Sequence, residues 1–233
     1  MPTISFVNSK GGVGKSTCAL LLATELAEQG ASVAMIDADP NQPLVRWSKK
    51  PGCPKGLTVI GGVTDKTLIR TIEAEERKKT FVIVDCEGSQ NLAVAQAMSR
   101  SDLLIVPIQA SELDAFEAVK IIEFIAVQEE TFRRPIPYAV IVTKTNHAVR
   151  PRTLTSLVQD ILAQGIPLFG CELNERDAFR AMFSFGGSLS GLDAKSVGGL
   201  PGALDNARKF AAEAIEMLKK HQQQADNARA EVA

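Results

Sequence analysis

The chain has 233 residues, of which 45% are hydrophobic and 23% are charged, and its formal net charge is −1. This length suffices for one sizeable α/β core, and the composition excludes a disordered chain. The near-neutral charge excludes a globally basic nucleic-acid-binding protein, so any contact with nucleic acid must come from a local patch.

The remaining composition argues against metal centres and membrane segments. The four cysteines are scattered without a C-x-x-C pair, and the chain has only two histidines, so a zinc or iron–sulfur site is not expected. The polar N-terminus does not resemble a signal peptide, and no apolar run approaches the roughly 20 residues of a membrane span. We expect a cytoplasmic protein without a membrane contact.

Apolar runs and helical patterns alternate along the chain. Six runs predict strands, over residues 3–7, 32–37, 57–61, 80–85, 102–108 and 137–143. Five periodic segments predict helices, over 15–29, 64–79, 111–128, 151–164 and 201–220. The strands are apolar nearly throughout, as in sheets covered on both faces. The alternation predicts an α/β fold with a mostly parallel, twisted sheet flanked by helices.

The same reading predicts one domain over residues 1–233. The glycine-rich segment 184–200 is expected to be a flexible loop, and residues about 221–233 are expected to form a polar, frayed tail. Ligands of parallel sheets bind beyond the carboxyl ends of the strands. Three motifs lie at such ends, over residues 8–17, 37–41 and 85–89.

The first motif, NSKGGVGKST at residues 8–17, predicts a phosphate-binding loop. A strand precedes it, a helix follows it, and it ends in the Gly-Lys-Ser of such loops, although Ser9 stands where the first glycine belongs. Lys15 would contact the β and γ phosphates, and the Ser16 hydroxyl would reach Mg²⁺. The residues expected to cradle ATP are Gly11, Gly12, Val13, Gly14, Lys15, Ser16 and Thr17.

The run KGGVGKST resembles the deviant phosphate loop of the ParA/MinD superfamily of ATPases, whose extra lysine corresponds to Lys10. The resemblance implies that Lys10 reaches across a dimer interface to the ATP of the partner. A lysine from each side would offset the charge of two nucleotides enclosed between subunits.

The resemblance also assigns roles to three aspartates. In MIDADPNQ, Asp39 would orient the attacking water and Asp37 would lie near the Mg²⁺ shell. By itself this segment favours an Asp-Pro turn after a strand, and its pairing with the phosphate loop favours the catalytic role. Asp85 ends an apolar strand as a Walker B carboxylate, held near Mg²⁺. After it, Gly88 could offer its amide to the γ-phosphate, and Glu87 could orient water or be a solvated carboxylate.

Longer stretches are similar to short partition ATPases typified by ParF and to VirC-type ATPases of conjugal DNA transfer. DADPNQPLVRWSKK and SDLLIVPIQASELD carry this similarity, which extends to about residue 185. By comparison with the VirC-type segment, ELNERDAF at residues 172–179 implies that Asn174 or Arg176 lies near the base. Thr143 or Lys144 is another candidate for that position.

The resemblance implies that the protein is a weak ATPase of plasmid partition. ATP would close a homodimer, the dimer would bind DNA without sequence preference on the nucleoid, and a DNA-binding or cargo adaptor protein would stimulate hydrolysis. Phosphate contacts require clustered basic side chains. The candidates are Arg150, Arg152, Arg176, Arg180, Lys195, Arg208, Lys209, Lys219 and Lys220.

Several alternatives remain open at this point. The protein could instead assist conjugal DNA transfer or position another cargo. A MinD-like membrane regulator would require a lipid-binding C-terminal helix, but the helix expected at 203–220 has an alanine-rich apolar face suited to covering the sheet. A relative of the nitrogenase iron protein would need paired cysteines, and a pure scaffold would use hydrolysis only as a timer. Trp47, beside Arg46 and Lys49, could stack on a base or partner or pack against the domain.

Overall fold

The computed structural model describes residues 1–146, 148 and 151–232. Its centre is a seven-stranded sheet of order β3-β2-β4-β1-β5-β6-β7, in which each recorded strand pair is parallel. The strands are β1 Thr3–Phe6, β2 Val33–Ala38, β3 Leu57–Ile60, β4 Phe81–Cys86, β5 Leu103–Gln109, β6 Tyr138–Thr145 and β7 Leu173–Asn174. The predicted α/β architecture is therefore confirmed.

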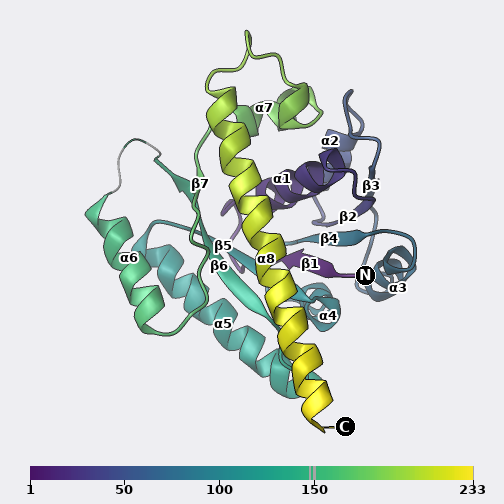
Figure 1. The fold of residues 1–233 in the computed structure, drawn as a ribbon, viewed down its shortest axis with the longest axis vertical. Coiled ribbons are helices and arrows are strands. Elements are labelled where there is room, and N and C mark those ends of the chain that lie inside the picture. Colours follow the sequence, from purple (N-terminus) through teal and green to yellow (C-terminus); the bar gives the residue numbers. More distant parts are fainter. Residues whose placement is uncertain (147, 149–150, 233) are drawn as a thin grey trace.

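Helices cover both faces of this sheet (Figure 1). One face packs against α1 Lys15–Glu28, α2 Pro43–Ser48, α7 Asp177–Phe185 and α8 Leu200–Val232. The other packs against α3 Leu68–Glu76, α4 Leu92–Arg100, α5 Glu112–Phe132 and α6 Arg152–Ala163. A short 3₁₀ helix, η1, spans Leu189–Gly191.

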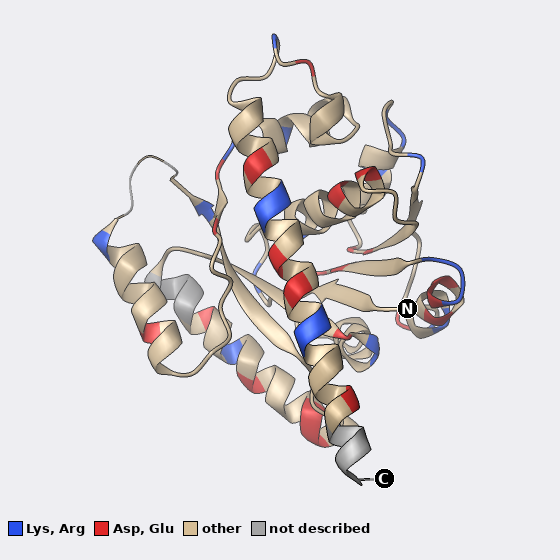
Figure 2. Ribbon diagram, in the orientation of Figure 1, with Lys and Arg blue, Asp and Glu red and all other residues tan. Residues whose placement is uncertain are grey.

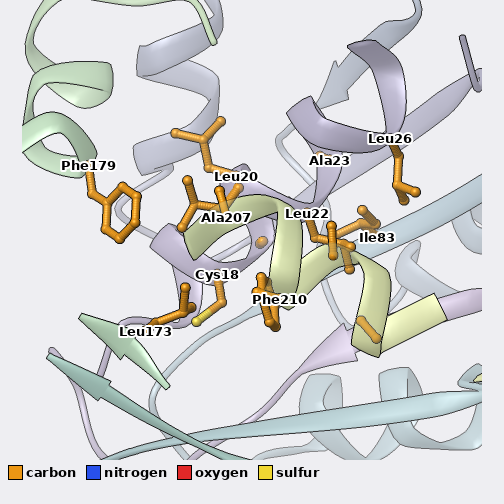
Figure 3. Packing of buried hydrophobic residues seen from close by; sticks show 14 of the residues in the cluster. Cys18, Leu20, Leu22, Ala23, Leu26, Ile83, Leu173, Phe179, Ala207 and Phe210 are labelled. Atoms are coloured by element: carbon orange, nitrogen blue, oxygen red, sulfur yellow. The ribbon is translucent and has the colours of Figure 1, made fainter. Parts of the chain in front are cut away.

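The strands divide their side chains between two hydrophobic cores. In β2, Val33 and Met35 join the α1 side while Ala34 and Ile36 join the α5 side. This alternation is the period of two that a strand imposes, and apolar residues at every position are what a sheet buried on both faces requires. Figure 3 shows the α1 side, where Phe210 of α8 lies beside Cys18 and Leu22 of α1.

Several elements differ from the sequence-based prediction. Helices α2, α4 and α7 and strand β7 were not predicted. The segment 184–200 was expected to be a flexible loop, but it contains η1 and buries Leu189 and Val197 in the core. Helix α8 continues through the expected frayed tail to Val232. The packing alternative for Trp47 is correct, because its side chain is 1% exposed and its Nε1 donates to the Gly187 carbonyl.

Candidate functional site

The phosphate loop connects β1 to α1 at the carboxyl end of the sheet, as the sequence predicts. Gly12 and Gly14 have φ angles of 79° and 101°, a conformation that a residue with a Cβ adopts only at a cost. Gly14 immediately precedes α1, whose first amides and dipole therefore face the loop. Gly11 and Gly12 are exposed, so the loop's centre is open to a ligand.

The Lys15 side chain folds back over the loop. Its Nζ donates to the Lys10 carbonyl at 2.9 Å, and the residue is 6% exposed. Burial lowers the pKa of Lys15, while the charges of Asp85 and Asp39 act in the opposite direction. The ammonium is thus partly desolvated at the position where negative phosphate oxygens would be bound most strongly.

Side chains from other elements hold the loop in place. Asn8 donates from Nδ2 to the Pro107 carbonyl at 2.7 Å, and its Oδ1 accepts from the Lys10 amide at 2.8 Å. Thr143 donates to the Val13 carbonyl at 2.7 Å, and Gln109 donates to the Gly12 carbonyl at 3.0 Å. Strands β5 and β6 therefore fix the loop from one side.

Asp37 and Asp85 lie opposite each other at the ends of β2 and β4. Asp85 is fully buried, and neither of its carboxylate oxygens has a hydrogen-bond partner among the described residues. Burial raises the pKa of Asp85 to about 7, although the neighbouring Ser16 hydroxyl lowers it. Buried carboxylate oxygens without partners are costly unless a ligand satisfies them, so this position fits a hydrated cation.

Asp37 also has a structural role that the sequence analysis missed. Its Oδ2 accepts from the amides of Leu44 at 2.8 Å and Val45 at 3.0 Å, and thus caps the start of α2. Burial raises the pKa of Asp37, and these backbone hydrogen bonds lower it. The sequence signal for this capping role was an aspartate six residues before Pro43, since proline favours the first turn of a helix.

The switch-like segments after β2 and β4 face the same site. Asp39 accepts from the Asn41 amide at 2.7 Å, which makes it part of a turn. Glu87 accepts from Asn91 Nδ2 at 2.8 Å. One cavity is lined by Asp39, Glu87 and Asn91 together with residues of the β3–α3 connection. Asp39 is therefore part of a turn and also faces a cavity, so its place in the turn is compatible with a water-orienting role.

A second cavity, of about 380 Å³, lies beside the phosphate loop. The four base-contact candidates, Asn174, Arg176, Thr143 and Lys144, all line it. The cavity also has Gly14, Thr17, Cys18, Leu173, Glu175, Phe179, Arg180 and Phe183 in its wall. Sequence reasoning missed the phenylalanines, which are the apolar surfaces that a planar base could contact.

The base-contact candidates are themselves constrained. Asn174 donates from Nδ2 to Thr145 Oγ1 at 2.8 Å, and its Oδ1 accepts from Arg176 at 3.1 Å. Within the described residues, Arg176 Nε is buried without a hydrogen-bond partner. Arg176 is therefore built into the cavity wall and is not a freely exposed cation.

Several of the remaining basic candidates lie beside acidic side chains. Arg180 pairs with Glu175 and Asp177, Lys209 pairs with Asp205, and Arg208 lies 3.9 Å from Glu25. Figure 2 shows that α8 carries basic and acidic residues along its length. Arg150 lies outside the described residues.

Comparisons with known proteins identify the family of this chain. The family model described as VirC1 protein matches residues 1–221. The chain belongs to the VirC1 family. It is 36% identical over 211 residues to Protein ParA of Rhizobium radiobacter. This alignment covers 91% of this chain and 95% of that protein. It is 28% identical over 187 residues to Protein virC1 of Rhizobium rhizogenes, covering 78% of this chain and 80% of that protein.

A solved structure supports the fold of this VirC1-family chain. The Cyanothece McdA(D38A)–ATP complex aligns with a TM-score of 0.74 over 96% of each chain, at 18% sequence identity. That structure supports the fold alone. The VirC1 model and the 36% identical Protein ParA confirm the resemblance to the ParA/MinD superfamily, a group of P-loop ATPases.

Proposed function

We propose that the protein is an ATP-dependent DNA-segregation ATPase of the plasmid-partition type. The observation that carries this proposal is a phosphate loop with two lysines, one of which, Lys15, is buried beside the unpartnered Asp85 carboxylate. Its supporting relative is Protein ParA, over nearly the full length of both chains.

In this proposal ATP binds along the loop, with its base in the cavity lined by Asn174 and Arg176. The amides of residues 11–17 and the Lys15 ammonium hold the phosphates. Ser16 and Asp85 would hold Mg²⁺, and Asp37 would lie near its shell. The cation would supply neutralisation of charge on the phosphate oxygens. Asp39 orients the attacking water, and its carboxylate accepts a hydrogen bond from that water.

In this proposal the activity of each site depends on Lys10 of a second copy of the chain. Its ammonium would contact the nucleotide of the partner subunit and stabilise the charge that develops during hydrolysis. The resulting dimer would bind DNA through phosphate contacts alone, and a DNA-binding or cargo adaptor protein would stimulate hydrolysis and release. The protein would accordingly reside in the cytoplasm, on the nucleoid.

A MinD-like role at a membrane has less support. Helix α8 buries Ala207, Phe210 and Ala214 in the core, so its apolar face already has a partner. Of the helices in the described residues, none has the length and hydrophobicity needed to cross a membrane. Cys86 is 1% exposed, as expected for a packed thiol and not for a cluster ligand between subunits.

The test is the Lys10→Ala variant. We expect it to retain nucleotide binding, because Lys15 and the loop amides remain, but to lose ATP-dependent retention on DNA and to hydrolyse ATP at least about tenfold more slowly. Retention on a DNA-coated surface with ATP and Mg²⁺ is the measurement. Wild-type retention and turnover by this variant would contradict the proposal, and Lys55→Ala, at an exposed position before β3, serves as the surface-lysine control.

A second candidate, an accessory ATPase of conjugal DNA transfer, also fits the match to the VirC1 model and the virC1 relatives. The two candidates share the site and differ in cargo. Stimulation of ATP hydrolysis by a small DNA-binding protein encoded nearby would support partition. Stimulation by a relaxase would support conjugal transfer.

A further inference from the structure

The position where an ordinary phosphate loop has its first glycine is attached to a helix far away in the sequence. Ser9 is half-buried, and its hydroxyl donates to Glu117 Oε2 at 2.8 Å across a separation of 108 residues. Glu117 lies in α5, which follows strand β5. A glycine at position 9 could not form this contact.

The Glu117 carboxylate is itself held in place. Its Oε1 lies 2.8 Å from Lys120 Nζ, and that ammonium lies 4.6 Å from the centre of the Phe116 ring. The Glu117 side chain is 27% exposed. Hydrogen bonds from Lys120 and Ser9 lower the pKa of Glu117, and the nearby charge of Lys10 contributes to this shift. The carboxylate is therefore charged at neutral pH and lies close to both Ser9 and Lys10.

We propose that Glu117 is a positioning residue for the phosphate loop, acting through the Ser9 hydroxyl on the backbone that leads into Lys10. The inference rests on the proposed function. Asn8 holds the Lys10 amide from one side, and Glu117 holds the preceding side chain from the other. Together they restrict the first half of the loop before nucleotide arrives, so less conformational entropy is lost on binding.

A double-mutant cycle of Ser9→Ala and Glu117→Ala tests this directly. The measurement is the affinity for a fluorescent ATP analogue with Mg²⁺, together with kcat and KM for ATP. Each single variant should bind roughly fivefold more weakly, the effect of losing one hydrogen bond. The double variant should bind no more weakly than either single variant, because both remove the same contact.

The expected kinetic effect is a higher KM with kcat retained, because the contact prepares the loop for substrate and does not act on the reacting atoms. Glu117→Gln keeps an oxygen that accepts from Ser9, and it should stay within about twofold of the wild-type affinity. Glu123→Ala, at an exposed position of the same helix, is the matched control, with the same expectation.

Two results would overturn the inference: wild-type affinity in both single variants, or effects that multiply in the double variant. Failure of the proposed function would look different, because the wild-type protein itself would then bind no ATP analogue.

Discussion

At the scale of single residues, the site contains buried ionisable side chains whose charged forms are not fully stabilised by the protein alone. Asp85 is fully buried and its carboxylate oxygens find no partner in the described part of the chain. Lys15, at 6% exposure, donates to a carbonyl of its own loop. Burial raises the pKa of the acid and lowers that of the base. Each charge is disfavoured in the free protein, and a nucleotide with a cation would satisfy both.

Gly88 provides a prediction at this scale. A Cβ at Gly88 would lie 2.9 Å from the Gly11 amide nitrogen and 3.1 Å from the Gly11 Cα. Both are backbone atoms of the phosphate loop, so Gly88→Ala must displace either the loop or the segment after Asp85. We expect roughly tenfold weaker ATP binding, equivalent to about 1.4 kcal/mol, as measured by titration calorimetry.

Gly198→Ala is the matched control, because a Cβ there meets no atom within 4 Å. It should bind ATP as the wild-type protein does. If Gly88→Ala and Gly198→Ala bound equally well, the close approach of Gly88 to the loop would have no functional consequence.

At the scale of elements, α8 covers α1 through an apolar contact that also contains a buried acid. Glu25 of α1 is 7% exposed, and its Oε2 lies 3.9 Å from Arg208 Nε of α8. Burial raises the pKa of Glu25, and the Arg208 charge only partly opposes it. Because the pKa in the folded state is higher than in the unfolded state, this group's contribution to stability is lost as the pH rises through the folded-state pKa.

Glu25→Gln should remove this pH dependence. Near pH 4 the variant and the wild-type protein should melt together, and near pH 8 the variant should melt higher by on the order of 2 °C. Calorimetry at the two pH values is the measurement. Glu216→Gln, at an exposed position of α8, should show no such gain, and an equal Tm for Glu25→Gln and wild type near pH 8 would refute the argument.

The elements that sequence predicted well are those with long, strongly patterned segments. Strands β1 to β6 are almost continuously apolar, and the phosphate loop has a distinctive composition. The missed elements are short: α2 has six residues and β7 has two. Helix α4 did have a local signal, because the Asn91 side chain accepts from the Val94 amide as an N-cap. The length of α8 could not be predicted, because its last turns are polar on all sides.

Within the site, the sequence pointed to residues of local motifs, but it missed several contacts that form only in three dimensions. Two features could be predicted from the sequence: the loop over residues 10–17, and Asp85 at the end of its apolar strand. The contacts of Glu117 with Ser9 and of Gln109 with Gly12 join segments about a hundred residues apart. No local pattern reports such a contact, because only the sheet order places β5 and α5 beside the loop.

At the scale of the whole molecule, the site lies open at the carboxyl edge of the sheet. The exposed glycines Gly11 and Gly12 and the half-buried Lys10 lie at its rim. The exposed apolar side chains of Leu92 and Phe116 belong to the helices that start at this same edge. Such an edge can be covered by a second copy of the chain, and in the proposed dimer this copy supplies its Lys10 to the neighbouring nucleotide.

The most direct test of this central claim mixes two inactive variants. Lys10→Ala keeps its own Lys15, and Lys15→Ala keeps its Lys10, so a mixed dimer contains one complete site. Each variant alone should hydrolyse ATP at no more than about a tenth of the wild-type rate. An equimolar mixture should regain roughly a quarter of wild-type turnover, since about half of the dimers are mixed and each has one working site of two. A mixture as inactive as its separate components, with mixed dimers demonstrated by crosslinking, would contradict the account.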